Sequence, residues 1–118
     1  MPYATPPIGD LRWEAPQPAD KWDGVLDATK MPNLCFQDKV PDPSQYKGSE
    51  DCLYLNVFTK IAEEDKKTKK HTIVWIHGGA FIFGGIDYYG AEYVMEYDDV
   101  ILVTVQVRKA NNSKSICR

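Results

Sequence analysis

Three stretches of the chain carry the apolar patterns of β-strands. Residues 52–59, CLYLNVFT, place apolar side chains at every second position, which predicts a strand with one well-buried face. Residues 71–77, HTIVWIH, and 100–107, VILVTVQV, are continuous apolar runs rich in β-branched residues. Such runs are typical of strands in a sheet that is covered on both faces.

The segment between the two continuous runs supplies a helix signal. In residues 91–97, Val94 lies one helical turn from Ala91 and Tyr97 lies one helical turn from Tyr93, which predicts a short helix. A strand, a loop with a helix and a second strand form the βαβ unit of a parallel sheet. The chain is therefore predicted to have an α/β fold.

The first 50 residues follow a different pattern, dominated by proline and turn residues. Prolines forbid long helices and central strands here, so we expect extended segments and loops that lie over another part of the molecule. Aromatic side chains would then anchor a region with little regular structure. The prolines are at positions 2, 6, 7, 16, 18, 32, 41 and 43, and the expected anchors are Trp13, Trp22 and Tyr46.

Two polar segments interrupt these patterns. Residues 60–70, KIAEEDKKTKK, are a charge run whose acidic and basic blocks largely cancel, which predicts a solvated connection. Residues 106–118 are polar, basic and aperiodic, and we expect a divergent, disordered tail after a domain that spans residues 1–105. Asn111-Asn112-Ser113 is a glycosylation sequon, a triplet that is common by chance.

Charge and composition exclude several functional classes. The 118 residues have a net charge of −3, which argues against nucleic-acid binding. No stretch approaches the roughly 20 apolar residues of a membrane span. No secretory signal is visible, because Met1 is followed directly by PYATPP. We expect no cofactor and no metal ion.

The three cysteines leave their redox state open. Cys35, Cys52 and Cys117 could form one disulfide with one free thiol, as in a secreted protein, or remain three thiols. Counting alone does not separate these alternatives.

Candidate chemistry lies in residues 74–85, VWIHGGAFIFGG, where an apolar strand ends in two glycine pairs. A nucleotide P-loop would need a closing Gly-Lys-Ser/Thr, and a dinucleotide site would need G-x-G-x-x-G; neither is present. Consecutive glycines also allow neighbouring N–H groups to turn toward one point, as in an oxyanion hole. A His-Gly-Gly loop after a strand has this role in lipases and esterases. The alternative is that the glycines only let the chain turn.

Several motifs in order resemble the type-B carboxylesterase and cholinesterase family of α/β hydrolases. The similarity runs from Pro2 to about Val105. From the glycine loop onward, the sequence is most similar to insect esterases. The motifs are PYATPPIGDLRWEAPQP at 2–18, WDGVLDAT at 22–29, CFQ at 35–37, EDCLYLNV at 50–57 and VWIHGGAFIFGG at 74–85. The resemblance implies a partial, incomplete α/β-hydrolase fold, made of N-terminal strands and loops and the first part of the central sheet.

The resemblance also assigns roles to residues. Gly79 and Ala80 match the positions whose N–H groups point at the oxyanion, and Gly78 sets the turn; Ala80 replaces a glycine common in the family. His77 is expected to be a packed, hydrogen-bonded residue and not the catalytic base. Cys35 and Cys52 match a family disulfide, which would imply an oxidising compartment, so the parent protein could be secreted or lie in the endoplasmic reticulum. Glu50 and Asp51 are expected to be buried and to form structural hydrogen bonds, and residues 81–83 could line a pocket or simply pack.

The catalytic residues of a serine esterase are not found in these 118 residues. None of Ser44, Ser49, Ser113 and Ser115 lies in a G-x-S-x-G motif, and the only histidines are His71 and His77. The expected function is therefore an N-terminal fragment of a carboxylic-ester hydrolase, inactive alone, whose parent would take a small-molecule carboxylic ester. The alternatives are a non-catalytic cholinesterase-like adhesion protein and an exon that reads into an intron. A fragment of this kind leaves apolar strand edges open, so we expect low solubility or a molten state.

Overall fold

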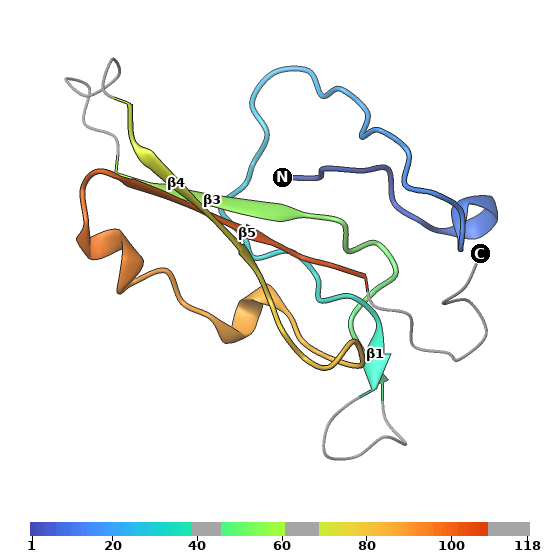
Figure 1. The fold of residues 1–118 in the computed structure, drawn as a ribbon. Coiled ribbons are helices and arrows are strands. Elements are labelled where there is room, and N and C mark those ends of the chain that lie inside the picture. The colour runs from blue at the N-terminus through green and yellow to red at the C-terminus, as the bar shows by residue number, and fades with distance from the viewer. Residues whose placement is uncertain (39–45, 61–68, 109–118) are drawn as a thin grey trace.

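A computed structural model describes residues 1–38, 46–60 and 69–108 of the chain, without the side chains of Asp38 and Tyr46. A three-stranded sheet forms its centre, with the order β3 (Leu55–Thr59), β5 (Val100–Val105), β4 (His71–Ile76) (Figure 1). All three predicted strands are present, although each is shorter than its apolar stretch. Several predictions fall outside this description. They concern the side chain of the expected anchor Tyr46, the charge run at 61–68, the sequon and Cys117.

The middle strand β5 joins the two outer strands in opposite senses. It pairs in parallel with β4, from His71 opposite Val100 to Ile76 opposite Val105, as predicted for a βαβ unit. It pairs antiparallel with β3, in a register that places Val57 opposite Val103. This arrangement puts the carboxyl end of β4 beside the carboxyl end of β5, where the glycine loop begins.

Burial in the sheet differs from the prediction that both continuous runs would be covered on both faces. Leu102 and Thr104 of β5 are buried, but every residue of β4 is exposed. In β3 the predicted buried face fades along the strand, from buried Leu53 just before it to exposed Val57. The physical reason is missing cover, because strand side chains stand perpendicular to the sheet and, among the described elements, only β5 packs extensively against β4, which is also an edge strand.

The open edge at β4 should drive self-association through unpaired backbone groups and apolar side chains. We expect Val74→Lys, at a side chain that is 58% exposed on this strand, to lower the weight-average mass several-fold in sedimentation experiments. The matched control is Val25→Lys, at a 99% exposed position in a loop, which should leave association unchanged. Equal effects of the two substitutions would contradict a role for the β4 edge.

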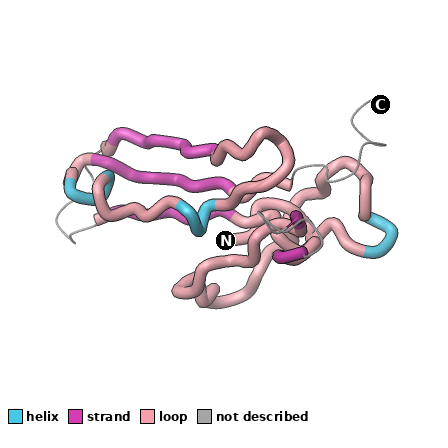
Figure 2. The backbone as a smooth tube through the Cα atoms, turned by 90° about the horizontal axis from the view of Figure 1, so that it is seen from below, coloured by secondary structure: helices cyan, strands magenta, loops and turns pink. Residues whose placement is uncertain are grey.

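The connection from β4 to β5 contains less helix than predicted. The predicted helix at 91–97 is wrong in extent: the structure has only two 3₁₀ turns in this connection, η3 (Ile86–Tyr88) and η4 (Val94–Glu96). Isolated helices this short are marginal, because few hydrogen bonds offset the cost of nucleation. Figure 2 shows the three strands side by side and the predominance of loops elsewhere. Among the described residues, no helix reaches the length and apolar character needed to cross a membrane.

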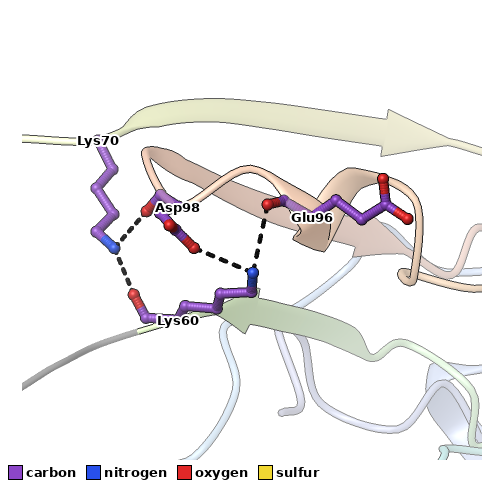
Figure 3. A network of polar contacts seen from close by, with 4 residues as sticks. All are labelled: Lys60, Lys70, Glu96 and Asp98. Carbon is purple, nitrogen blue, oxygen red and sulfur yellow. Dashed lines mark hydrogen bonds and ion pairs between the residues drawn. The ribbon is translucent and has the colours of Figure 1, made fainter.

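A small polar network ties the ends of the strands to the loop that follows η4 (Figure 3). Lys60 Nζ, just after β3, forms an ion pair of 3.0 Å with Asp98 Oδ1 and donates to the Glu96 carbonyl. Lys70 Nζ, just before β4, donates to the main-chain carbonyls of Asp98, at 2.6 Å, and Lys60. These groups are exposed, so the ion pair contributes at most about 1 kcal/mol.

The N-terminal segment, which contains η1 (Gly9–Leu11), lies against the start of β3 as an extended chain. Tyr3 N–H donates to the Leu53 carbonyl at 3.0 Å, and Ala4 is buried. The prediction that Trp13 and Trp22 anchor this segment is wrong, since they are 56% and 46% exposed. Main-chain pairing, not the indole rings, attaches the segment to the sheet.

A disulfide between Cys35 and Cys52 confirms the pairing that the family resemblance implied, with a Cα–Cα distance of 4.9 Å. Both cysteines belong to the buried apolar cluster, together with Ala4 and Leu53. The bridge fixes the start of a second, two-stranded sheet, β1 (Gln37–Asp38) and β2 (Tyr46–Lys47), beside the central one. Gly48 follows β2 with φ +95°, and a Cβ there would lie 2.4 Å from the Cys35 carbonyl oxygen.

Candidate functional site

The glycine loop begins at His77, the first buried residue after β4. Its Nδ1 lies 2.9 Å from the Gly78 carbonyl oxygen, and its Nε2 accepts a 3.5 Å hydrogen bond from Val107 N–H. These partners assign the proton to Nδ1, because a carbonyl can only accept. With both ring nitrogens engaged, His77 is a packed, hydrogen-bonded residue, as predicted.

The backbone after Gly78 adopts a run of positive φ angles. Gly79, Ala80 and Phe81 have φ values of +121°, +52° and +60°. A left-handed conformation costs a non-glycine residue about 1–2 kcal/mol, so Ala80 and Phe81 are strained. Strain of this kind concentrates at functional sites. A glycine at position 80 would be less strained than the alanine, because it has no Cβ.

Hydrogen bonds close this turn on the carbonyl of Gly79. Ile82 N–H and Phe83 N–H both donate to that oxygen, at 2.9 and 3.1 Å. The N–H groups of Gly79 and Ala80 donate to no acceptor within the described residues. Ala80 is exposed and Gly79 is partly exposed, so both donors are available to an incoming acceptor.

The second glycine pair, Gly84 and Gly85, lies where the loop packs too tightly for side chains. Gly84 has φ +129°, and a Cβ at this residue would lie 2.5 Å from the Gly78 carbonyl oxygen and 2.7 Å from His77 Nδ1. A Cβ at Gly85 would lie 2.0 Å from Leu34 Cδ2. The loop therefore returns to its own starting point, and only a residue without a side chain fits there.

A buried glutamine that sequence reasoning missed holds this return point. Gln37 Oε1 accepts from Gly84 N–H at 2.7 Å, and Gln37 Nε2 donates to the Gly84 carbonyl at 2.8 Å and the Cys35 carbonyl at 3.0 Å. Its side chain crosses from β1 to the loop, 47 residues away in sequence. The only signal was the glutamine of the CFQ motif, an amide beside a cysteine in a polar segment.

Gln106, just after β5, holds the end of the loop in a similar way. Its side chain is fully buried, and its Oε1 accepts from Ile86 N–H at 3.0 Å. Its main chain accepts a 2.8 Å hydrogen bond from the Tyr3 hydroxyl and donates to the Tyr54 carbonyl. Burial raises the pKa of the Tyr3 phenol, and the charge of Arg108 partly opposes this shift. Gln106 is thus packed, although residues 106–118 were predicted to form a tail; residues 109–118 lie outside the description.

The two acidic residues of the EDCLYLNV motif are structural in this arrangement but are not buried. Glu50 forms a 2.5 Å ion pair with Arg12, and both side chains are partly exposed. Asp51 is partly exposed and forms a hydrogen bond with Tyr54. Burial, and then this hydrogen bond and the Asp51 charge, raise the pKa of the Tyr54 phenol. Burial of both acids was therefore an incorrect expectation, while their use in structural contacts was correct.

The aromatic residues of the loop do not form an enclosed pocket. Phe81 is 83% exposed, and Ile82 and Phe83 are exposed as well. Ile82 and Phe83 border a shallow hollow next to the disulfide, which is also lined by Cys35, Phe36, Gln37, Gly84 and Val107. Gly79 and Ala80 do not line this hollow.

Comparison with known proteins identifies the family of the chain. Residues 1–110 match the model of the carboxylesterase family. The chain is 39% identical over 120 residues to a medium-chain fatty acyl-CoA hydrolase precursor of Anas platyrhynchos, covering 92% of this chain and 21% of that protein. It is 40% identical over 119 residues to human carboxylesterase 5A, with 92% and 20% covered.

Solved esterase structures show the same partial fold. The Geobacillus stearothermophilus carboxylesterase EST55 superposes with a TM-score of 0.76 at 38% identity, covering 93% of this chain and 22% of that one. A PNB esterase superposes with a TM-score of 0.73 at 40% identity, covering 92% and 22%. The fold is part of an α/β hydrolase, and the chain spans about a fifth of the length of the relatives it matches.

Proposed function

Because the chain belongs to the carboxylesterase family, we propose that it supplies two of the three donors of the oxyanion hole of a carboxylic-ester hydrolase and none of the residues that attack the ester. The N–H groups of Gly79 and Ala80 are the two donors, and Gly78 sets the turn that presents them. The observation that carries this proposal is the run of positive φ angles at Gly79, Ala80 and Phe81, with both amides unbonded within the described residues.

The chemistry of ester hydrolysis sets what these donors do. Attack on an ester carbonyl places negative charge on its oxygen, and each preorganised donor stabilises that charge by about 3 kcal/mol. The energy is gained only when a nucleophile forms the tetrahedral intermediate, because a ground-state carbonyl carries little charge. In this fold the third donor comes from the residue after the nucleophile, so two donors are an incomplete hole.

The remaining catalytic groups must come from polypeptide outside these 118 residues. No G-x-S-x-G motif is present, and the ring nitrogens of His77 are both hydrogen-bonded. A serine nucleophile needs a base to take its proton and an acid to orient the base. The substrate of the complete enzyme would be a small-molecule carboxylic ester.

A fluorophosphonate probe tests this division of roles, since it labels activated serines covalently. The purified chain should remain unlabelled at concentrations that label the Geobacillus carboxylesterase completely. Labelling of this chain would contradict the proposal. Saturable binding of a protein partner, together with the absence of label from any longer polypeptide that contains this segment, would instead favour a cholinesterase-like adhesion protein.

A further inference from the structure

We propose that Gln37 is a positioning residue for the oxyanion donors, acting through Gly84. This inference rests on the proposed function of the Gly79 and Ala80 amides. Gln37 is 3% exposed and carries an uncharged amide in a part of the chain with little regular structure. A buried amide is costly unless its polar atoms are paired, and here both of them are.

The Gln37 side chain binds both main-chain polar groups of Gly84. Gly84 donates to Oε1 at 2.7 Å and accepts from Nε2 at 2.8 Å, so the side chain replaces the pairing that a neighbouring strand would provide. Reversing the amide would set donor against donor and acceptor against acceptor, which fixes its orientation. Gly84 is thereby held at one distance and one angle from β1.

The next step passes from Gly84 to the donors. Gly84 lies against the Gly78 carbonyl and the His77 ring so closely that not even a methyl group fits between them. The turn from Gly79 to Phe83 spans only the residues between these two contact points, and it is closed by the bonds from Ile82 and Phe83 to the Gly79 carbonyl. Displacement of Gly84 must therefore change the turn that orients the Gly79 and Ala80 amides.

The disulfide fixes the other end of this connection. Cys35 accepts from Gln37 Nε2 through its carbonyl and is bonded to Cys52, and both cysteines are buried. Gln37 is therefore anchored two residues from a covalent link to the segment that leads into β3. The turn at 79–83 is therefore held at one end by β4, which precedes it, and at the other end by Gln37 and the Cys35–Cys52 disulfide.

Hydrogen exchange measured by mass spectrometry tests the coupling, in Gln37→Met and in the matched control Gln17→Met, whose exposed side chain donates a hydrogen bond to the nearby Ala15 carbonyl. We expect Gln37→Met to speed exchange at least ten-fold at Gly84 and at Ile82 and Phe83, which donate to Gly79 and not to Gln37. Acceleration of Gly84 alone, or equal acceleration of the β5 amides, would overturn the positioning role.

A second variant keeps the test decisive should Gln37→Met unfold the chain. In Gln37→Glu, a protonated carboxyl can still donate to one Gly84 group and accept from the other, whereas the ionised form cannot donate. Burial away from a donor raises the pKa of such a carboxyl. Exchange at Ile82 and Phe83, relative to the wild type at the same pH, should be normal at pH 5 and at least ten-fold faster at pH 8. A ratio independent of pH would refute the proposal, and neither result depends on whether any ester is hydrolysed.

Discussion

Replacing Gly84 with alanine is expected to destabilise the chain by about 3 kcal/mol or more, the range seen when a clash adds to backbone strain. The φ of +129° is rarely adopted by residues with a side chain, and the added Cβ would lie 2.5 Å from the Gly78 carbonyl oxygen. That atom belongs to the backbone, so it cannot rotate away as the end of a flexible side chain would. The clash must instead shift Gly78 or break the hydrogen bonds between Gly84 and Gln37.

Two control variants separate the clash from the strain. Gly24→Ala also has a positive φ, +71°, but this value lies close to the left-handed region and the space around the new Cβ is open, so it should cost only about 1 kcal/mol. Gly78→Ala meets neither problem and should change the free energy of unfolding little. Urea denaturation followed by tryptophan fluorescence, in a Val74→Lys background that keeps the chain dispersed, measures all three. Equal destabilisation by Gly84→Ala and Gly24→Ala would show that the close approach to Gly78 is not rigid.

Removing the Cys35–Cys52 disulfide is the second large effect. The bridge joins residues 17 apart in sequence, and a closed loop of this size contributes about 3 kcal/mol on the chain-entropy model. Its two ends are the most buried members of the cluster with Ala4 and Leu53, so the bridge also orders the core that the N-terminal segment packs against. The double variant Cys35→Ala with Cys52→Ala should lower the free energy of unfolding by about that amount.

Cys117 should be replaced by alanine in every sample of this experiment, so that a third thiol cannot exchange with the bridge. Reductant should then lower the urea midpoint of the protein with both cysteines and leave the double variant unchanged. A midpoint that is insensitive to reductant in both proteins would contradict a stabilising disulfide.

The sequence was sufficient to predict the three strands, because apolar periodicity and β-branched content are local signals, and the βαβ pattern predicted the parallel pairing of the last two. The antiparallel pairing of β3 with β5 was not predicted. The runs at 71–77 and 100–107 became the parallel pair β4 and β5. Burial could not be predicted in the same way, since it depends on which neighbours cover a strand. Val74 has the side chain of a buried strand and is nevertheless exposed at the edge of this sheet. The helix at 91–97 failed for a related reason, because a short segment needs tertiary contacts to become a regular helix.

The loop of the candidate site was predicted from motifs, but the buried residues that hold the loop in place were not. The two glycine pairs of the motif predicted the loop. The structure adds that Ala80 has a strained positive φ and that Gly84 is packed too tightly for a side chain. Gln37 and Gln106 were missed, because a glutamine in a polar or frayed segment has no local pattern that predicts burial. Their roles come from contacts with residues 47 and 20 positions away in sequence.

The central claim is that this chain holds donors for a negative oxygen but nothing that can attack a carbonyl. Hydrolysis of p-nitrophenyl acetate and p-nitrophenyl butyrate by the purified 118-residue chain tests it most directly, with Gly79→Val and a protein-free blank alongside. The φ of +121° at Gly79 makes valine incompatible with the turn, so this variant should turn the Gly79 and Ala80 N–H groups away from the oxyanion position. We predict that neither protein exceeds the blank. Turnover by the wild-type chain that disappears in Gly79→Val would contradict the claim.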